Sequence, residues 1–411
     1  MTQTKTLAQI SAWLRSGRLR TIGVLLVCAF VVAECAVRLV GESDADGNFV
    51  VLGSRLPPFR FPALRMREQL DEYLSTETWM RYSSSLGWVP REGSFTSPSG
   101  GRFYNNKGAR VAHSSDRTED KAALDVFRIV LIGDSFTHGD DIPFCDSIGA
   151  LLQLKLDEQS EAYEVINLAV SGYGMDQALI RLQEEGLALA PDLVIFGYQP
   201  ENIGRNLNLH RGFLWWKSQL PFSKPRFRLV KSRLEPVNWP TRSIDSLNAS
   251  FNTGWDEDFL ADEYFYDERL YASTVVRRSR LLGLMEKAWS VLRGVEWHAV
   301  VDQSPEGNPG RLALAIMAAM HDGSKASGAN FLVVYLPRVT DITTAAGGGR
   351  HDHERLLNAI SSRFELVNPE AALVKLQLSA GVEAMSAEHS GHYSRESCEV
   401  VASALHNVLR D

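Results

Sequence analysis

Cysteine is scarce in this 411-residue chain, and positive charge is not in excess. The four cysteines include no pair at metal-ligand spacing, which excludes a zinc ribbon and a redox CxxC motif. The net charge of −7 lacks the basic excess that is typical of nucleic-acid-binding proteins, so we expect no nucleic acid among the partners. The hydrophobic content of 45% and the charged content of 23% are ordinary values for a folded protein, and the sequence shows no internal repeats.

Long apolar runs are also rare, and the most apolar one lies near the start of the chain. It is uninterrupted from Thr21 to Ala33, which suits the apolar core of a cleaved signal peptide. Counted through Val40 it has about 20 residues, which is enough to cross a bilayer. Glu34 and Arg38 interrupt the second part, but they lie one helical turn apart and can pair near the membrane surface.

The charges on the two sides of this run differ in sign. Basic residues precede it and acidic residues follow it: Lys5, Arg15, Arg18, Arg20, Glu42, Asp44 and Asp46. By the positive-inside rule, this asymmetry predicts a basic cytoplasmic N-terminus over 1–20, a transmembrane anchor over 21–40 and an extracytoplasmic (periplasmic) remainder. The sequence therefore predicts a single-pass protein of the cell membrane, with a cleaved signal peptide or a buried soluble helix as the alternatives.

The pattern of the chain changes at Val126. Residues 41–125 contain many Gly, Pro, Ser and Arg residues without a long periodic run, and we expect an N-terminal extension laid over the domain that follows. Strand-like and helix-like segments alternate over 126–206, stop over 207–325 and resume over 326–411. The strand-like segments are 126–132, 165–168, 192–198, 330–336 and 365–367. This alternation predicts a three-layer α/β/α sandwich around a mostly parallel five-stranded sheet, interrupted by a long insertion with helices.

The most informative short motif is Gly133-Asp134-Ser135, directly after the first predicted strand. A hydroxyl nucleophile is best placed at the carboxyl end of a strand, where open α/β sheets bind their ligands. Small residues before Ser135 permit a sharp turn, and backbone N–H groups beside it can stabilise an oxyanion. We expect Asp134 to brace the turn by hydrogen bonds. The alternative is a serine that only caps the next helix.

Four segments in this order resemble the sequence blocks of the SGNH (GDSL-type) hydrolase family. The Gly-Asp-Ser motif is similar to the first block, and Gly172, just past the second predicted strand, is similar to the second. Past the third strand, a strict match places Glu201 where the family has Asn, and we prefer Asn202 because its amide can donate a hydrogen bond. The fourth block is an Asp-x-x-His near the C-terminus, and His392 matches its His.

The fourth block departs from the family pattern. The residue three positions before His392 is His389 rather than Asp. In a catalytic triad, the acidic member holds the base in one tautomer and stabilises the imidazolium. The alternatives for orienting His392 are Glu388 or another carboxylate, His389, and a backbone carbonyl.

The resemblance, which covers both halves of the predicted core, implies an SGNH/flavodoxin-like fold and a mechanism that needs no metal and no cofactor. In it, Ser135 is the nucleophile and His392 is the general base. The backbone N–H groups of Ser135 and Gly172 and the side-chain amide of Asn202 form the oxyanion hole.

Two further residues are candidates for substrate binding. His138 lies one helical turn after Ser135, and it either lines the cleft or is a solvent-exposed helix residue. Arg205 either binds substrate or pairs with an acid such as Glu201.

Cys145 and Cys398 fall on the apolar faces of two helices that are neighbours in the fold implied by the resemblance. In an oxidising compartment they can form a disulfide. Two buried free thiols that behave as small hydrophobic residues are the alternative.

The resemblance and the predicted anchor together imply a function. The first expectation is a serine carboxylic ester hydrolase that acts outside the cytoplasmic membrane on O-acyl groups, above all O-acetyl groups, of envelope or exported polysaccharide. The second is a polysaccharide O-acetyltransferase that uses the same acyl-serine and a membrane acyl-donor partner. The third is a non-catalytic carbohydrate-binding module. A lipase needs a large apolar mouth, and no apolar loop in the sequence indicates one.

Overall fold

The computed structural model of the chain describes residues 17–97, 100–120, 126–159, 162–274, 276–293, 301–388 and 390–410. These residues belong to two compact units. The smaller unit lies within Met1–Arg65 and Tyr266–Val300, and the larger one lies within Met66–Phe265 and Val301–Asp411. The predicted N-terminal extension and the predicted insertion therefore each contribute to both units.

The larger unit is built around a sheet of eight strands in the order β15-β14-β11-β9-β10-β8-β7-β6. Five of them pair in parallel, which confirms the predicted core. These are β9 (Val126–Ile132), β10 (Ala162–Asn167), β11 (Leu193–Tyr198), β14 (Asn330–Tyr335) and β15 (Leu366–Val367). Numbered along the chain, the parallel strands lie in the order 2-1-3-4-5, which is the flavodoxin-like order and brings the ends of β9 and its neighbours together.

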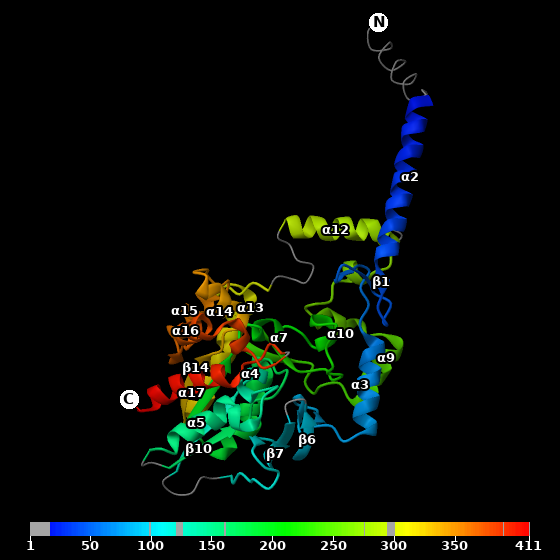
Figure 1. Ribbon diagram of the computed structural model, residues 1–411. Helices are drawn as coiled ribbons and strands as arrows, with labels where there is room; N and C mark the ends of the chain where they lie inside the picture. The colour runs from blue at the N-terminus through cyan, green and yellow to red at the C-terminus, as the bar shows by residue number, and fades with distance from the viewer. Residues whose placement is uncertain are drawn as a thin grey trace. The chain divides into compact units, whose positions relative to one another are not determined.

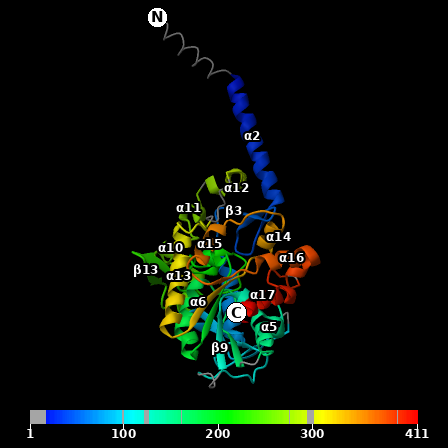
Figure 2. The same ribbon diagram turned by 90° about the vertical axis from the view of Figure 1, so that its left-hand side faces the viewer.

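Alternate residues of β9 point into two apolar layers, as the pleat of a strand requires. Ile129 and Leu131 belong to one buried cluster, and Val130 and Ile132 belong to the other. Helices α5 (Ile148–Leu156) and α17 (Arg395–Arg410) cover the first face, and α6 (Met175–Arg181) and α13 (Asn308–Ala326) cover the second. Figure 2 shows these two pairs of helices on opposite sides of the sheet. The predicted three-layer α/β/α sandwich is confirmed.

The N-terminal extension is more regular than its sequence indicates. It adds three antiparallel strands to the edge of the parallel sheet, β8 (Arg110–Val111), β7 (Gly100–Tyr104) and β6 (Gly93–Ser97). It also forms a hairpin of β4 (Met80–Ser83) and β5 (Gly87–Pro90). These strands have two to five residues each, which is too short for an alternating pattern to be recognised in the sequence.

The other elements outside the central sheet are mostly short helices. They are α3 (Ala63–Ser75), α4 (Ser135–His138), α7 (Asn202–Arg205), α8 (Arg211–Leu214), α9 (Ile244–Thr253), α10 (Glu257–Asp262), α11 (Glu268–Tyr271), α14 (Val339–Ala346), α15 (Glu354–Ser361) and α16 (Glu370–Ala380). One hairpin, β12 (Arg226–Val230) with β13 (Arg233–Val237), belongs to the insertion.

The smaller unit contains the predicted membrane segment. Helix α2 (Gly17–Val40) is followed by a three-stranded sheet of β1 (Glu42–Ser43), β2 (Phe49–Val51) and β3 (Ser54–Leu56), and α12 (Arg280–Leu292) completes the unit. Within α2, the 21 residues Arg20–Val40 form a stretch long and apolar enough to cross a membrane, and none of it is buried in the protein. A signal sequence has the same length and composition, so these two properties do not separate an anchor from a cleaved segment.

Candidate active site

Ser135 lies where the strand β9 turns into the short helix α4. Gly133 has a φ of +155°, and a Cβ at this position would collide with the side chain of Thr137. Asp134 is the N-cap of α4, and its carboxylate accepts a hydrogen bond of 3.0 Å from the backbone N–H of Phe136. The turn therefore needs both a glycine and a capping carboxylate, as the sequence analysis expected of Asp134.

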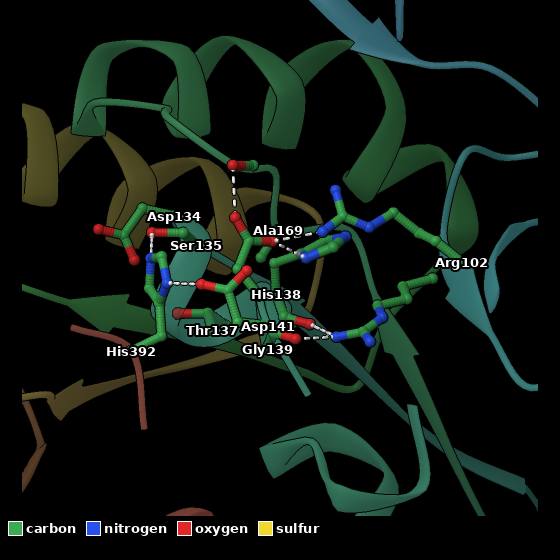
Figure 3. Close-up of polar contacts among 12 residues, drawn as sticks. Arg102, Asp134, Ser135, Thr137, His138, Gly139, Asp141, Ala169 and His392 are labelled. Carbon is green, nitrogen blue, oxygen red and sulfur yellow. Dashed lines mark hydrogen bonds and ion pairs between the residues drawn. The ribbon is translucent and has the colours of Figure 1, made fainter. Parts of the chain in front are cut away.

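Three side chains form a hydrogen-bonded relay at the end of β9 (Figure 3). The Nε2 atom of His392 lies 2.9 Å from Oγ of Ser135. The Nδ1 atom of the same ring lies 2.7 Å from Oδ2 of Asp141. His392 comes from the loop before α17, and Asp141 follows α4. A serine, an imidazole and a carboxylate in this sequence of contacts have the geometry of a nucleophile, its general base and the group that orients the base.

Asp141 is the carboxylate that lies beside His392, in place of the named candidates Glu388 and His389. A neutral imidazole with Nε2 toward the serine carries one hydrogen on Nδ1, and Asp141 accepts it, so Glu388 is not the orienting group. His389, the other candidate, lies outside the described residues. Asp141 is missed by a search for Asp-x-x-His because it follows the nucleophile by six residues instead of preceding the histidine.

A local signal for Asp141 was present in the sequence. Gly139 ends α4 with a φ of +81°, and Asp141 itself has a φ of +65°. Aspartate is one of the few residues besides glycine that tolerates this left-handed region. A glycine followed by two acidic residues, one helical turn after a candidate nucleophile, therefore predicts a tight turn of the chain. Such a turn can place a carboxylate near the nucleophile.

The charges around the relay shift the pKa values of His392 and Asp141 in opposite directions. Burial alone would lower the pKa of His392, but the hydrogen bond to Asp141 and the negative charges of Asp140, Asp141 and Asp134 outweigh burial and raise it. The hydrogen bond from His392 lowers the pKa of Asp141. Asp141 is therefore ionised, and a carboxylate in this position favours the imidazolium form of His392.

Two backbone N–H groups are available beside Ser135. Within the part of the chain that the structure describes, no carbonyl or side chain accepts a hydrogen bond from the backbone N–H of Ser135 or of Gly172. Gly172 has a φ of +81°, and a Cβ there would lie 2.7 Å from Leu220. The indole Nε1 of Trp88 donates a hydrogen bond of 3.1 Å to the carbonyl of Ser171, so the N-terminal extension holds this loop in place.

Asn202, the third predicted oxyanion donor, is buried at the start of α7. With its amide nitrogen turned toward Asp134 and the carbonyl of Tyr173, it donates to them at 3.3 and 3.2 Å. With the opposite orientation, its oxygen accepts from Arg205 at 3.4 Å, which leaves the nitrogen for an oxyanion. Burial raises the pKa of Asp134, and the charge of Arg205 lowers it. The assignment of Asn202 to the oxyanion hole stays a prediction.

Arg205 is a structural residue rather than a substrate-binding one. Its Nη1 atom lies 2.9 Å from Asp134 and 3.2 Å from the carbonyl of Tyr173, and its Nη2 atom lies 3.1 Å from Glu201. Of the two alternatives left by the sequence, the structure therefore supports pairing with acids. The guanidinium ties α7 to the turn that carries Ser135.

His138 neither lines the cleft nor faces solvent, and both expectations for it were wrong. Its side chain is completely buried, and its ring centroid lies 5.8 Å from that of Tyr104 in β7. Tyr104 of β7 lies 3.0 Å from Nε2 of His138 through its hydroxyl, and Nδ1 lies 2.6 Å from Asp140. Burial is the main cause that lowers the pKa of His138 to about 4.

Asp140 connects this buried histidine to the loop of Gly172. Its carboxylate accepts a hydrogen bond of 2.5 Å from the hydroxyl of Ser171, and Arg102 lies 3.6 Å away. Burial alone would raise the pKa of Asp140, but His138 and Arg102 outweigh burial and hold it well below its usual range. This network of His138, Asp140 and Arg102 therefore fixes the loop that carries Gly172.

Of the two alternatives for Cys145 and Cys398, the structure shows free thiols and no disulfide between them. Cys145 is an exposed free thiol, and Cys398 is a buried one on the apolar face of α17. Burial raises the pKa of Cys398 to about 12, so it is an inert part of the core.

Comparisons with known proteins find similarity in structure only. No protein-family profile matches the sequence, and no curated protein matches it. Similar solved structures include an acetylxylan esterase, Axe2, from Geobacillus stearothermophilus (11% identity, 68% of this chain and 93% of that one, TM-score 0.34). Others are a lipase/acylhydrolase from Enterococcus faecalis (13%, 69% and 95%, 0.34) and a GDSL-like lipase from Bacteroides thetaiotaomicron (11%, 69% and 87%, 0.31).

Replacing Asp141 by Asn tests the relay. Asn keeps the size and tolerates the positive φ, but it removes the negative charge that raises the pKa of His392. Because the base must be neutral, we expect the acidic limb of kcat/KM for an activated ester to move to lower pH, while kcat falls by about 10²- to 10⁴-fold. The matched control is Asp157→Asn at the exposed end of α5, and an unmoved acidic limb in Asp141→Asn would remove Asp141 from the relay.

Replacing Gly197 by Ala tests the packing of the turn. A Cβ on Gly197 of β11 would overlap the hydroxyl of Thr137 in α4, whereas a Cβ on Gly204 of α7 meets no atom closer than 3.9 Å. We expect Gly197→Ala to destabilise the chain by about 1–3 kcal/mol and to reduce ester hydrolysis. Gly204→Ala should be neutral or stabilising by about 0.5 kcal/mol. Urea midpoints of the two variants measure the difference, and equal midpoints would contradict this account.

Proposed function

We propose that this chain is a serine carboxylic ester hydrolase. The observation that supports it best is the hydrogen-bonded relay of Ser135, His392 and Asp141 at the carboxyl end of a central strand. In this relay the nucleophile, its base and the group that orients the base already lie within hydrogen-bond distance, at 2.9 and 2.7 Å. This arrangement argues against a non-catalytic binding module.

The reaction follows from the geometry. His392 takes the proton of Ser135 through Nε2 while Oγ attacks the ester carbonyl, and Asp141 stabilises the imidazolium. The N–H groups of Ser135 and Gly172, with the amide of Asn202, hold the negative charge on the carbonyl oxygen. His392 then gives its proton to the leaving alcohol. Water, deprotonated by the same imidazole, attacks the acyl carbon. The bond between this carbon and Oγ of Ser135 then breaks, Oγ takes the proton back from His392, and the acid is released.

The substrate proposal is narrower. We propose O-acyl groups, above all O-acetyl groups, of an envelope or exported polysaccharide, because α2 and the charges around it support a catalytic unit anchored outside the cytoplasmic membrane. An acyltransferase would form the same acyl-serine and would differ only in the nucleophile that reaches it, a sugar hydroxyl in place of water.

Hydrolysis of p-nitrophenyl acetate by the full chain in detergent tests the proposal. We expect turnover that falls by at least about 10³-fold in Ser135→Ala and in His392→Ala, because each removes an essential member of one unit. Ser379→Ala, exposed on α16, is the control and should keep full activity. Background rates in all four proteins would refute hydrolysis of simple esters.

The same assay separates hydrolase from transferase. A burst of about one p-nitrophenol per chain, followed by turnover that rises with an added oligosaccharide acceptor, would favour transfer. Steady turnover that the acceptor does not change supports the hydrolase.

A further inference from the structure

Helix α12 of the smaller unit carries its large apolar side chains on the outside. Met285 and Trp289 are each 58% exposed, and Leu292 is 81% exposed. These three residues are spaced by four and three positions, so they lie on one face of the helix. The residues that α12 buries are Gly283 and Ser290.

The opposite face of α12 is the one that packs on the protein. A Cβ on Gly283 would lie within 4 Å of the carbonyl oxygen of Pro57 and of the side chain of Leu56, at the end of β3. Leu284 packs on the small cluster of Phe49 and Val51. The helix therefore packs through Gly283, Leu284 and Ser290, while Met285, Trp289 and Leu292 form an apolar face that this unit does not cover.

The start of α12 is fixed to the membrane helix. Glu34 of α2 accepts hydrogen bonds from the backbone N–H of Arg280 at 3.0 Å and of Leu281 at 2.8 Å, and another from the hydroxyl of Ser279 at 2.8 Å. Arg38 donates to the same carboxylate at 2.7 Å. Glu34 therefore caps α12 from another helix, and cleavage after α2 would remove this cap.

The contact with Glu34 also determines where along the axis of α2 the helix α12 begins. Glu34 lies six residues before the end of α2, which is ~9 Å along the axis. A carboxylate is costly in hydrocarbon, and here it is bonded by a cation and three donors, as expected at a membrane boundary. Figure 1 shows α12 leading away across the end of α2 instead of running alongside it.

We propose that α12 lies in the membrane–water interface, on the extracytoplasmic side of the bilayer that α2 crosses, and inserts Met285, Trp289 and Leu292 among the lipids. This inference rests on the proposal that α2 is a retained anchor. Tryptophan prefers the interface, and an amphipathic helix buries its apolar face in the boundary between headgroups and acyl chains. Arg293 stacks on Trp289 at 4.5 Å and carries positive charge to the level of the headgroups. The occupant of the exposed face is thus the bilayer that α2 crosses.

Quenching of tryptophan fluorescence by brominated lipid tests this proposal. The full chain is placed in vesicles of phosphatidylcholine and phosphatidylglycerol with brominated acyl chains. We expect Trp289→Phe to lose a large part of the lipid-quenched emission. Trp215→Phe, which removes a tryptophan of similar exposure (52%) from the larger unit, should lose none of it.

Flotation of the vesicles distinguishes the outcomes. A chain that floats with the vesicles while Trp289→Phe leaves the quenching unchanged would overturn the interfacial helix and keep the anchor. A chain that does not float would overturn both. A chain of doubled mass in which Trp289 is shielded from brominated lipid would assign the face to a second copy, which also overturns the proposal. Hydrolysis of a soluble ester should be the same in wild type and Trp289→Phe, so a failed esterase assay is a separate result.

Discussion

The hydrogen bond between His392 and Asp141 joins parts of the chain that are 251 residues apart, and the chemistry of the site depends on it. It forms only if β9 pairs with β11 and β11 pairs with β14, so that the loop before α17 returns to the end of β9. It also requires Asp141 to hold a left-handed backbone conformation, which costs free energy unless its surroundings fix it. Both the packing of the sheet and the local turn are therefore needed for the hydrogen bond between His392 and Asp141.

Part of that support comes from the N-terminal extension. Arg110 of β8 donates to the carbonyl of His138 at 2.7 Å and to that of Ile142 at 2.6 Å, so one guanidinium holds both ends of the segment that contains Asp141. Trp88 positions the loop of Gly172 from the same extension. The parallel sheet is therefore complete without the N-terminal extension, but an ordered relay also needs the contacts that the extension makes.

The sequence predicted the features that depend on local pattern. Continuous β-branched runs indicated the parallel strands, and the motif after the first of them indicated Ser135, since a strand end is a defined place in this type of sheet. Asp141 was not predicted because its role depends on a single left-handed residue in a loop. His138 was misjudged because the strand that buries it has five residues and no recognisable alternation. The exposed apolar face of α12 could not be predicted from the sequence, because an apolar stripe on a helix normally faces the core.

The position of His392 in the chain has a consequence for biosynthesis. Ser135 is made 257 residues before its base, and a lone serine hydroxyl is a weak nucleophile at neutral pH. If the chain is exported while still extended, the nucleophile crosses the membrane long before the histidine that activates it. Acyl groups on the cytoplasmic side would then never meet an assembled relay, and a chain cut short before residue 392 would be inert wherever it came to rest.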